Sequence, residues 1–179
     1  MKQQLSSIKE KASGFAIMAL KNVPEVTKAT WKLRAFALLK IPMIAFLGPR
    51  VTEINSGRIS ITIPLGYRSR NHLKSMYFGA LAAGADLAIG LLAMKNIEES
   101  GEKIQLIFKD FSAEYLKRAE SDVQFICEDG EKITALVQRA CASEDRVQET
   151  FHAYALTPAT LGTEPVAKFA LTLSLKKKN

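Results

Sequence analysis

The sequence has few of the residues that stabilise small secreted domains or bind metals. It contains two cysteines and two histidines in 179 residues, and neither cysteine has a Cys or His at metal-ligand spacing. We therefore expect no metal site, and we interpret Cys127 and Cys141 as reduced thiols in a cytoplasmic protein. Glycine and proline are also scarce, at ten and six residues. This composition excludes a collagen-like chain and a wholly disordered one.

Acidic side chains are scarce at the N-terminus. Residues 1–40 contain eight Lys and Arg against only Glu10 and Glu25, whereas the remaining residues hold 17 basic and 16 acidic side chains. The net charge of +7 therefore belongs mostly to the first forty residues. A nearly neutral main body disfavours nucleic acid as a partner.

The sequence also lacks a long apolar run free of charge. Residues 75–94 are long enough to span a bilayer, but they carry Asp86 near the middle. Inserting that carboxylate costs roughly 2.5 to 3.5 kcal/mol, and the many Gly and Ala residues offset little of it. We expect a buried helix and no stable membrane insertion. The nearest candidate for a secretory signal, residues 15–20, is too short, so we expect none.

The N-terminal residues have helical periodicity. Apolar residues at steps of three and four over residues 3–21 predict an amphipathic helix. Pro24 can start a second helix, which Pro42 ends. We expect residues 1–41 to form a helical hairpin before a main domain at residues 42–179. This lysine-rich hairpin could cover an edge of its own sheet or rest on an anionic membrane.

From Pro49 the apolar period changes to two, which predicts strands. A Ser56-Gly57 turn predicts a first hairpin, and the strands near residues 104–108 and 123–127 are expected to form a second. Residues 130–140 have the spacing of a short helix or a crossing linker, and two strands near residues 147–155 and 166–175 finish the chain. The fold class is therefore α+β, with about six antiparallel strands.

The most informative element is a predicted helix over residues 76–96. It contains Gly79, Gly84 and Gly90 among many alanines. Because glycine inside a helix costs about 1 kcal/mol relative to alanine, such a helix needs close backbone approach by a neighbour. A curved antiparallel sheet wrapped around this helix, or a second copy packed against it, would provide that neighbour.

The segment from Arg70 to Asp86 resembles the signature of hotdog-fold acyl-CoA thioesterases of the phenylacetate-pathway type. The resemblance covers about residues 42–176 and implies a hotdog fold. In that family an Asn stands six residues before a His-Gly-Gly at a helix N-terminus, and an acid follows nine residues after the His. This chain has Asn71, then Tyr77-Phe78-Gly79, then Asp86, so Tyr77 replaces the His and Phe78 the first Gly.

The resemblance implies a role for each of these residues. Asp86 would be the general base or nucleophile, the Phe78 amide beside Gly79 would polarise the thioester carbonyl, and Asn71 would orient substrate or water. A helix N-terminus can stabilise the developing negative charge, and burial raises the pKa of an acid. Since Phe78 and Asp86 are roughly 12 Å apart along one helix, the site must combine two chains. We expect a homodimer, or a dimer of dimers.

Three cations lie beside this segment, where they could bind the phosphates of coenzyme A or simply form a solvated loop: Arg68, Arg70 and Lys74. His72 lies 14 residues before Asp86, a spacing also seen in hotdog dehydratases, although a loop-capping role is the simpler interpretation.

Tyr77 and Phe78 would line the acyl pocket or pack between subunits. We interpret the protein as an acyl-CoA thioesterase that needs no cofactor beyond the coenzyme A of its substrate. One alternative is a hotdog protein that binds acyl-CoA or a fatty acyl ligand without turnover. A weaker one is a dehydratase or hydratase of hydroxyacyl or enoyl thioesters.

Overall fold

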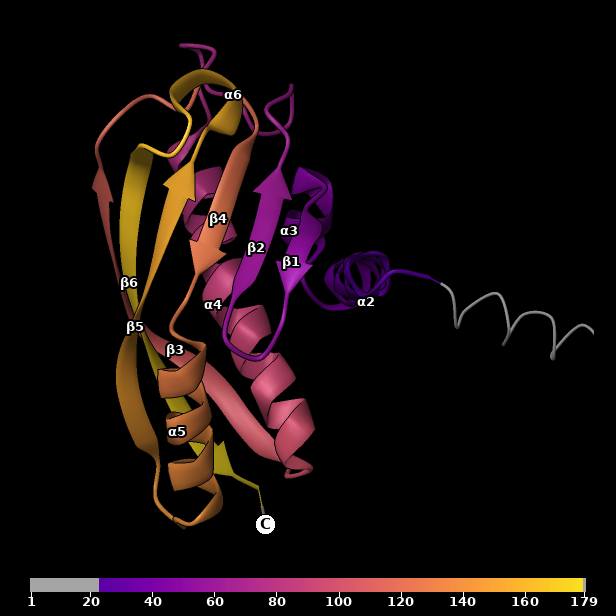
Figure 1. Cartoon of the computed structure of the whole chain (residues 1–179), viewed down its shortest axis with the longest axis vertical. Helices are drawn as coiled ribbons and strands as arrows, with labels where there is room; N and C mark the ends of the chain where they lie inside the picture. Colours follow the sequence, from indigo (N-terminus) through magenta and orange to yellow (C-terminus); the bar gives the residue numbers. More distant parts are fainter. Residues whose placement is uncertain (1–22, 179) are drawn as a thin grey trace, which may run out of the picture.

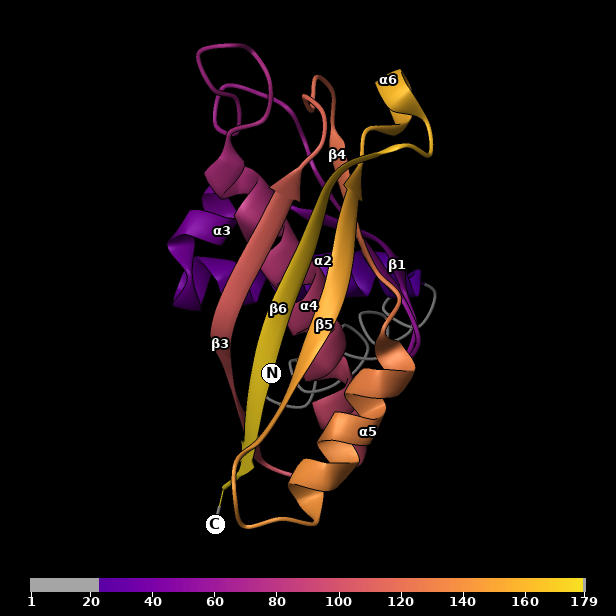
Figure 2. The ribbon, with the colours of Figure 1, turned by 90° about the vertical axis from the view of Figure 1, so that its left-hand side faces the viewer.

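A computed structural model describes residues 23–178, so the helix expected over residues 3–21 lies outside the described residues. A six-stranded antiparallel sheet curves around one long helix (Figures 1 and 2). The strands are β1 (Arg50–Ile54), β2 (Ile59–Ile63), β3 (Ile104–Tyr115), β4 (Val123–Cys127), β5 (Val147–Leu156) and β6 (Pro165–Lys177). The helices are α2 (Glu25–Lys40), α3 (Pro42–Leu47), α4 (Phe78–Ser100), α5 (Gly130–Cys141) and α6 (Pro158–Leu161).

Helix α4 is the central helix that the sequence predicts, and it lies against the inner face of the sheet. A Cβ atom added at Gly84 would lie only 2.3 to 2.5 Å from ring atoms of Phe125 on β4, so glycine is what lets the helix approach this strand. By length and composition α4 could cross a membrane, but eleven of its residues are buried in the fold. It is therefore a core helix, as expected.

The predicted second hairpin is wrong. Strand β3 pairs with β6, from Ile104 opposite Lys177 to Tyr115 opposite Ala167, while β4 lies between β2 and β5. The connection between β3 and β4 is hydrogen-bonded to two separate places. At its start the Leu116 N–H donates to the Val166 carbonyl, and at its end Asp122 accepts from the Leu65 N–H. These bonds fix the two ends of the connection, which runs from β3 at the edge of the sheet to β4 beside β2.

Helix α2 covers the edge strand β1. The Thr30 hydroxyl accepts a hydrogen bond from the Val51 N–H at 3.0 Å, and its oxygen lies 3.3 Å from the Val51 carbonyl. Leu33 and Ala37 are buried on the same side of the helix. The structure thus confirms the helix expected after Pro24, and it places this helix over an edge of its own sheet. The division between residues 41 and 42 stays a prediction.

Two further helices surround the core. Pro42 ends α2 but also occupies the first turn of α3, a short helix that periodicity did not reveal. Helix α5 confirms the helical alternative for residues 130–140, and it packs beside α4. The Thr134 hydroxyl donates to the Asn96 side chain at 2.6 Å, which joins the two helices.

The first prediction compares two glycines of α4. We expect Gly84→Ala to lower the free energy of unfolding by about 1 to 3 kcal/mol, because its methyl group would overlap the Phe125 ring. At Gly90 the nearest atom to an added Cβ is Phe108 Cζ at 3.4 Å, so Gly90→Ala is expected to be neutral or to gain up to about 1 kcal/mol. Urea unfolding of both variants measures this difference, and equal effects would contradict it.

Candidate active site

Asp86 lies on a half-exposed stripe of α4. The residues of this stripe are four apart and are less buried than their neighbours: Phe78, Ala82, Asp86, Gly90 and Met94. Gly84 faces Phe125, and Asp86 follows two residues later, roughly 200° further around the helix. The Asp86 side chain therefore points away from the centre of the sheet that wraps α4.

The Asp86 carboxyl group has no compensating partner. Within residues 23–178 it makes no hydrogen bond and no ion pair, and it is the first charged residue of α4, ahead of Lys95. Its surroundings include Gly90 and Phe108, which are apolar. Burial in these surroundings raises the pKa of Asp86 to about 6. Such a carboxylate can accept a proton near neutral pH.

The N-terminus of α4 offers two amide donors. The N-cap residue Tyr77 donates its own N–H to the Ser69 carbonyl at 2.8 Å, and no side chain caps the helix. Among the described residues, no acceptor pairs with the N–H groups of Phe78 and Gly79. Unpaired amides at a positive helix end can bind an oxyanion, as the resemblance implies.

Two aromatic rings border these amides. The Phe78 side chain is 60% exposed, and its ring centroid lies 4.6 Å from that of Tyr77. A Cβ atom added at Gly79 would lie 2.5 Å from Tyr77 Cε1, so the Tyr77 ring occupies the space that a side chain at position 79 would need. The Tyr77 ring therefore lies directly over the first turn of α4.

Asn71 lies in the loop before α4, and its side chain is hydrogen-bonded within that loop. Its Oδ1 atom accepts from the Leu73 N–H at 2.9 Å and from the Ser75 N–H at 3.2 Å, and its Nδ2 donates to the Ser75 hydroxyl at 3.1 Å. Lys74 has a positive φ of 62° in the same loop. In this conformation Asn71 shapes the backbone that leads into α4.

The predicted phosphate-binding side chains Arg68, Arg70 and Lys74 are all exposed, and so is His72 in the same loop. Arg68 lies over the Phe46 ring, 5.6 Å from its centroid. It also lines a cavity of about 450 Å³ with Arg34 and Arg50, which the sequence analysis did not single out. Arg34 belongs to α2 and Arg50 to β1, so no local spacing could reveal that the three arginines line one cavity.

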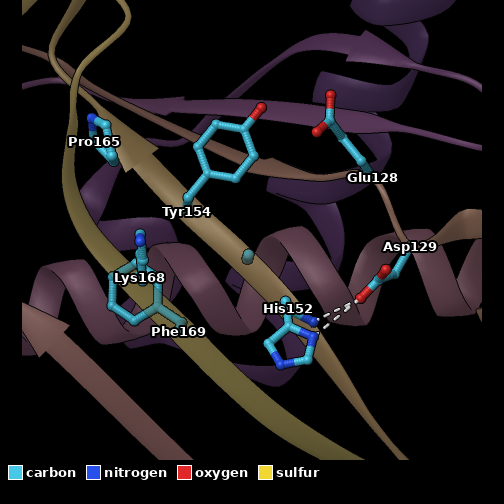
Figure 3. A pocket seen from close by; sticks show the side chains of 8 residues that line it. Glu128, Asp129, His152, Tyr154, Pro165, Lys168 and Phe169 are labelled. Atoms are coloured by element: carbon cyan, nitrogen blue, oxygen red, sulfur yellow. Dashed lines mark hydrogen bonds and ion pairs between the residues drawn. The ribbon is translucent and has the colours of Figure 1, made fainter.

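A second cavity, of about 410 Å³, involves titratable residues that the sequence analysis also missed (Figure 3). Asp129 accepts from the His152 backbone N–H at 2.8 Å and pairs with Lys132 at 2.8 Å. Burial opposes its ionisation, but these hydrogen bonds prevail and lower the pKa of Asp129. Both Asp129 oxygens accept hydrogen bonds, one from Lys132 on α5 and one from the His152 backbone on β5, so Asp129 joins the start of α5 to β5. Asp86, in contrast, accepts no hydrogen bond from residues 23–178.

Groups of acidic, Cys or His side chains that could bind a metal are absent from residues 23–178.

Comparisons with known proteins identify a family and similar folds. Residues 29–155 match the family described as a domain of unknown function, DUF4442. The chain belongs to this family. No curated protein matches the sequence.

Solved structures resemble the whole fold. A candidate thioesterase from Shewanella oneidensis is 14% identical with a TM-score of 0.71, over 84% of this chain and 99% of its own. A Pseudomonas aeruginosa protein of unknown function, for which thioesterase activity is suggested, is 22% identical with a TM-score of 0.70. The match covers 87% of this chain and 99% of that protein. A thioesterase from Haemophilus influenzae is 16% identical with a TM-score of 0.63. The match covers 88% of this chain and 94% of that protein.

These likenesses establish the hotdog fold that the segment from Arg70 to Asp86 implied. None of the three proteins is described as a phenylacetate-pathway enzyme, so that finer assignment stays a prediction.

The second prediction concerns the stability of Asp86→Asn. Because the pKa of Asp86 is raised from 3.8 to about 6, the folded state keeps a proton between these values that the unfolded chain has released. The contribution of Asp86 to the stability of the native chain therefore falls as the pH rises from 4 to 6, by up to about 3 kcal/mol. Asparagine removes this loss, so the advantage of Asp86→Asn should grow from pH 4 to pH 7.

Chemical unfolding at pH 4, 5, 6 and 7, at one fixed protein concentration, measures the effect. The exposed Asp145 provides a matched control, and Asp145→Asn is expected to keep the pH dependence of the native chain. A constant difference between Asp86→Asn and the native chain would contradict the raised pKa.

Proposed function

We propose that this protein hydrolyses acyl-CoA thioesters at a site shared by two copies of the chain. The observation that carries the proposal is the unpartnered Asp86, with its pKa near 6, on the open side of α4. The amides at the start of the same helix supply the complementary electrophilic site. The thioesterases among the similar structures support this reading through the shared fold.

The reaction needs one base and one oxyanion site. Asp86 in its ionised form takes a proton from a water molecule, whose oxygen attacks the thioester carbonyl carbon. The Phe78 and Gly79 amides stabilise the negative charge that forms on the carbonyl oxygen. When the C–S bond breaks, the proton held by Asp86 passes to the departing thiolate. The products are a carboxylic acid and a free thiol.

One chain cannot bring these parts together, because its own Phe78 and Asp86 are roughly 12 Å apart along α4. A second copy can complete the site if it covers the half-exposed stripe. Strand β3 ends the sheet, so one of its edges has no partner within the described chain. Ile107, Phe111 and Tyr115 on β3 are all exposed. We infer a homodimer that buries these residues, or a dimer of such dimers.

The coenzyme A part of the substrate is anionic, and the cations of the loop before α4 complement it. Arg70 and Lys74, with Arg68 and His72 nearby in sequence, are exposed and free to contact phosphates. Coenzyme A then enters only as part of the substrate, and the proposed reaction needs no other cofactor. A coenzyme A substrate also fits the cytoplasmic location that we propose.

The Tyr77 ring favours a second candidate, an acyl-CoA-binding protein without turnover. This ring lies against Gly79, where the thioester carbonyl would have to approach the amides. If the ring stays in place when a ligand binds, the chain would hold the acyl group but leave the thioester intact.

The third prediction separates these candidates. Thiol release is measured with short, long and aromatic acyl-CoAs, for the native chain, Asp86→Asn and the control Asp145→Asn. We expect release by the native chain and by the control, and a loss of at least about a hundredfold in Asp86→Asn. The native rate should rise with pH through about 6 as Asp86 ionises.

Full activity in Asp86→Asn would exclude Asp86 as the base. Saturable acyl-CoA binding without thiol release in the native chain would instead establish the binding protein.

The fourth prediction tests the shared site through β3. Phe111 is 43% exposed, and Phe111→Lys places a charge in the proposed interface. Because the Phe111 ring also lies 6.0 Å from that of the buried Phe169, circular dichroism first checks that the variant folds. We expect light scattering to show a dimer for the native chain and a monomer for Phe111→Lys, with thiol release lost together with the dimer. The control Met43→Lys changes an exposed residue on α3 and should stay dimeric. An active monomer would rule out a shared site.

A further inference from the structure

Helix α2 has large apolar side chains on both of its sides, with lysines among those of the outer side. Leu33 and Ala37 face the protein and are buried. On the opposite side Trp31 is 54% exposed, Leu38 68% and Leu39 78%. These three residues share one helix face, because they are spaced by seven and eight residues. A surface helix normally turns polar residues to water, so the outer face of α2 has the composition of a contact surface.

Helix α3 extends this surface. Met43 is 66% exposed and Phe46 53%, while Ile44 and Leu47 on the same short helix are buried. We call the exposed set the α2–α3 patch; its members are Trp31, Leu38, Leu39, Ile41, Met43 and Phe46. Large adjoining apolar groups at a protein surface mark a binding site for a partner or a membrane. Figure 1 shows α2 beyond β1, at the side of the molecule.

Basic side chains surround the patch. Residues 24–50 contain five Lys and Arg and one acid, Glu25. The cavity with three arginines adjoins the patch directly, because Leu38 also lines it and Phe46 lies under Arg68. In the sequence, residues 1–22 add four lysines and one glutamate immediately before α2.

Only part of this positive charge is balanced by acids of the described chain. Lys32 pairs with Glu98 at 3.7 Å, and Arg50 pairs with Asp122 at 3.5 Å, both in exposed positions. Neither Arg34 nor Arg68 has an ion pair within residues 23–178. Arg34 does donate from Nε to the Pro49 carbonyl at 3.3 Å, which fixes its guanidinium group beside the cavity.

We propose that the α2–α3 patch docks on the surface of an anionic lipid bilayer. The apolar side chains would enter the interface between headgroups and acyl chains, and the arginines of the adjoining cavity would bind lipid phosphates. Tryptophan beside leucine, with lysine and arginine around them, is the composition that such interfaces favour. This proposal does not depend on the hydrolysis reaction.

Charge distinguishes a bilayer from a second copy as the occupant. Two copies that met symmetrically at this patch would bring the same basic residues face to face, which like-charge repulsion opposes. An anionic surface attracts them. The apolar residues that we assign to the dimer are on β3, whereas α2 covers β1 at the other end of the strand order.

The chain has a single tryptophan, and it belongs to the patch, so its fluorescence reports docking directly. The full chain is mixed with vesicles of phosphatidylcholine alone or with added phosphatidylglycerol. We expect the Trp31 emission to shift to shorter wavelength and to resist acrylamide quenching with the anionic vesicles. Vesicles of phosphatidylcholine alone should have a much smaller effect, and added salt should reduce the binding.

Matched variants test each half of the surface by vesicle co-sedimentation. Leu38→Gln/Leu39→Gln keeps the charge and should weaken binding by about tenfold or more. Arg34→Gln should weaken binding about fivefold. Arg139→Gln on α5 removes the same charge elsewhere and should bind as the native chain does. Circular dichroism of each variant confirms that it folds.

Three outcomes would overturn the proposal. The first is an unchanged Trp31 emission with anionic vesicles. The second is emission that is already at short wavelength and protected from acrylamide without lipid, which would show that the chain itself covers the patch. The third is a shift that depends on protein concentration in the absence of lipid and is prevented by Leu38→Gln/Leu39→Gln, which would assign the patch to a second copy.

Discussion

The close approach of α4 to β4, at Gly84 and Phe125, is the constraint on which the rest of this structure depends. A side chain at position 84 would overlap the Phe125 ring, and the sheet could no longer wrap the helix at this distance. The same contact determines how α4 is rotated about its axis. With Gly84 turned to the sheet, Asp86 is turned to the open side, where it remains half-buried beside apolar neighbours. The packing of the core therefore places the acid and raises its pKa.

The pKa values of two partly buried carboxyl groups, Asp86 and Asp129, are shifted in opposite directions. Asp129 is surrounded by donors, and the bonds from Lys132 and the His152 backbone lower its pKa in spite of burial. Asp86 has burial without donors, and its pKa rises. An acid that only supports a fold is usually satisfied in the way Asp129 is. An unsatisfied acid costs stability, which is why Asp86 and not Asp129 is the candidate for catalysis.

Features that depend on local spacing could be predicted from the sequence, and those that depend on distant contacts could not. The period of two in Ile59, Ile61 and Ile63 predicted a strand, and the glycines predicted a tightly packed central helix. The pairing of β3 with β6 joins segments far apart in the sequence, from Ile104 opposite Lys177 to Tyr115 opposite Ala167, and no local hydrophobic pattern records it. The sequence also did not predict that three arginines from separate elements line one cavity. It predicted a role for Asn71 but not the hydrogen bonds that its side chain makes within its own loop.

The two ends of the sheet raise the same physical problem, since an edge strand exposes unpaired backbone groups. At β1 part of the problem is solved within the chain, because the Thr30 hydroxyl accepts a hydrogen bond from the Val51 N–H and α2 covers the strand. This solution has a consequence, because α2 turns an apolar face outward as well as inward. At β3 no element of the described chain covers the free edge. Each end of the sheet thus leaves apolar surface exposed, on β3 beside charges of both signs (Lys109, Asp110 and Glu114) and on α2 amid positive charge. That difference in charge is the reason for assigning a second copy to one surface and an anionic bilayer to the other.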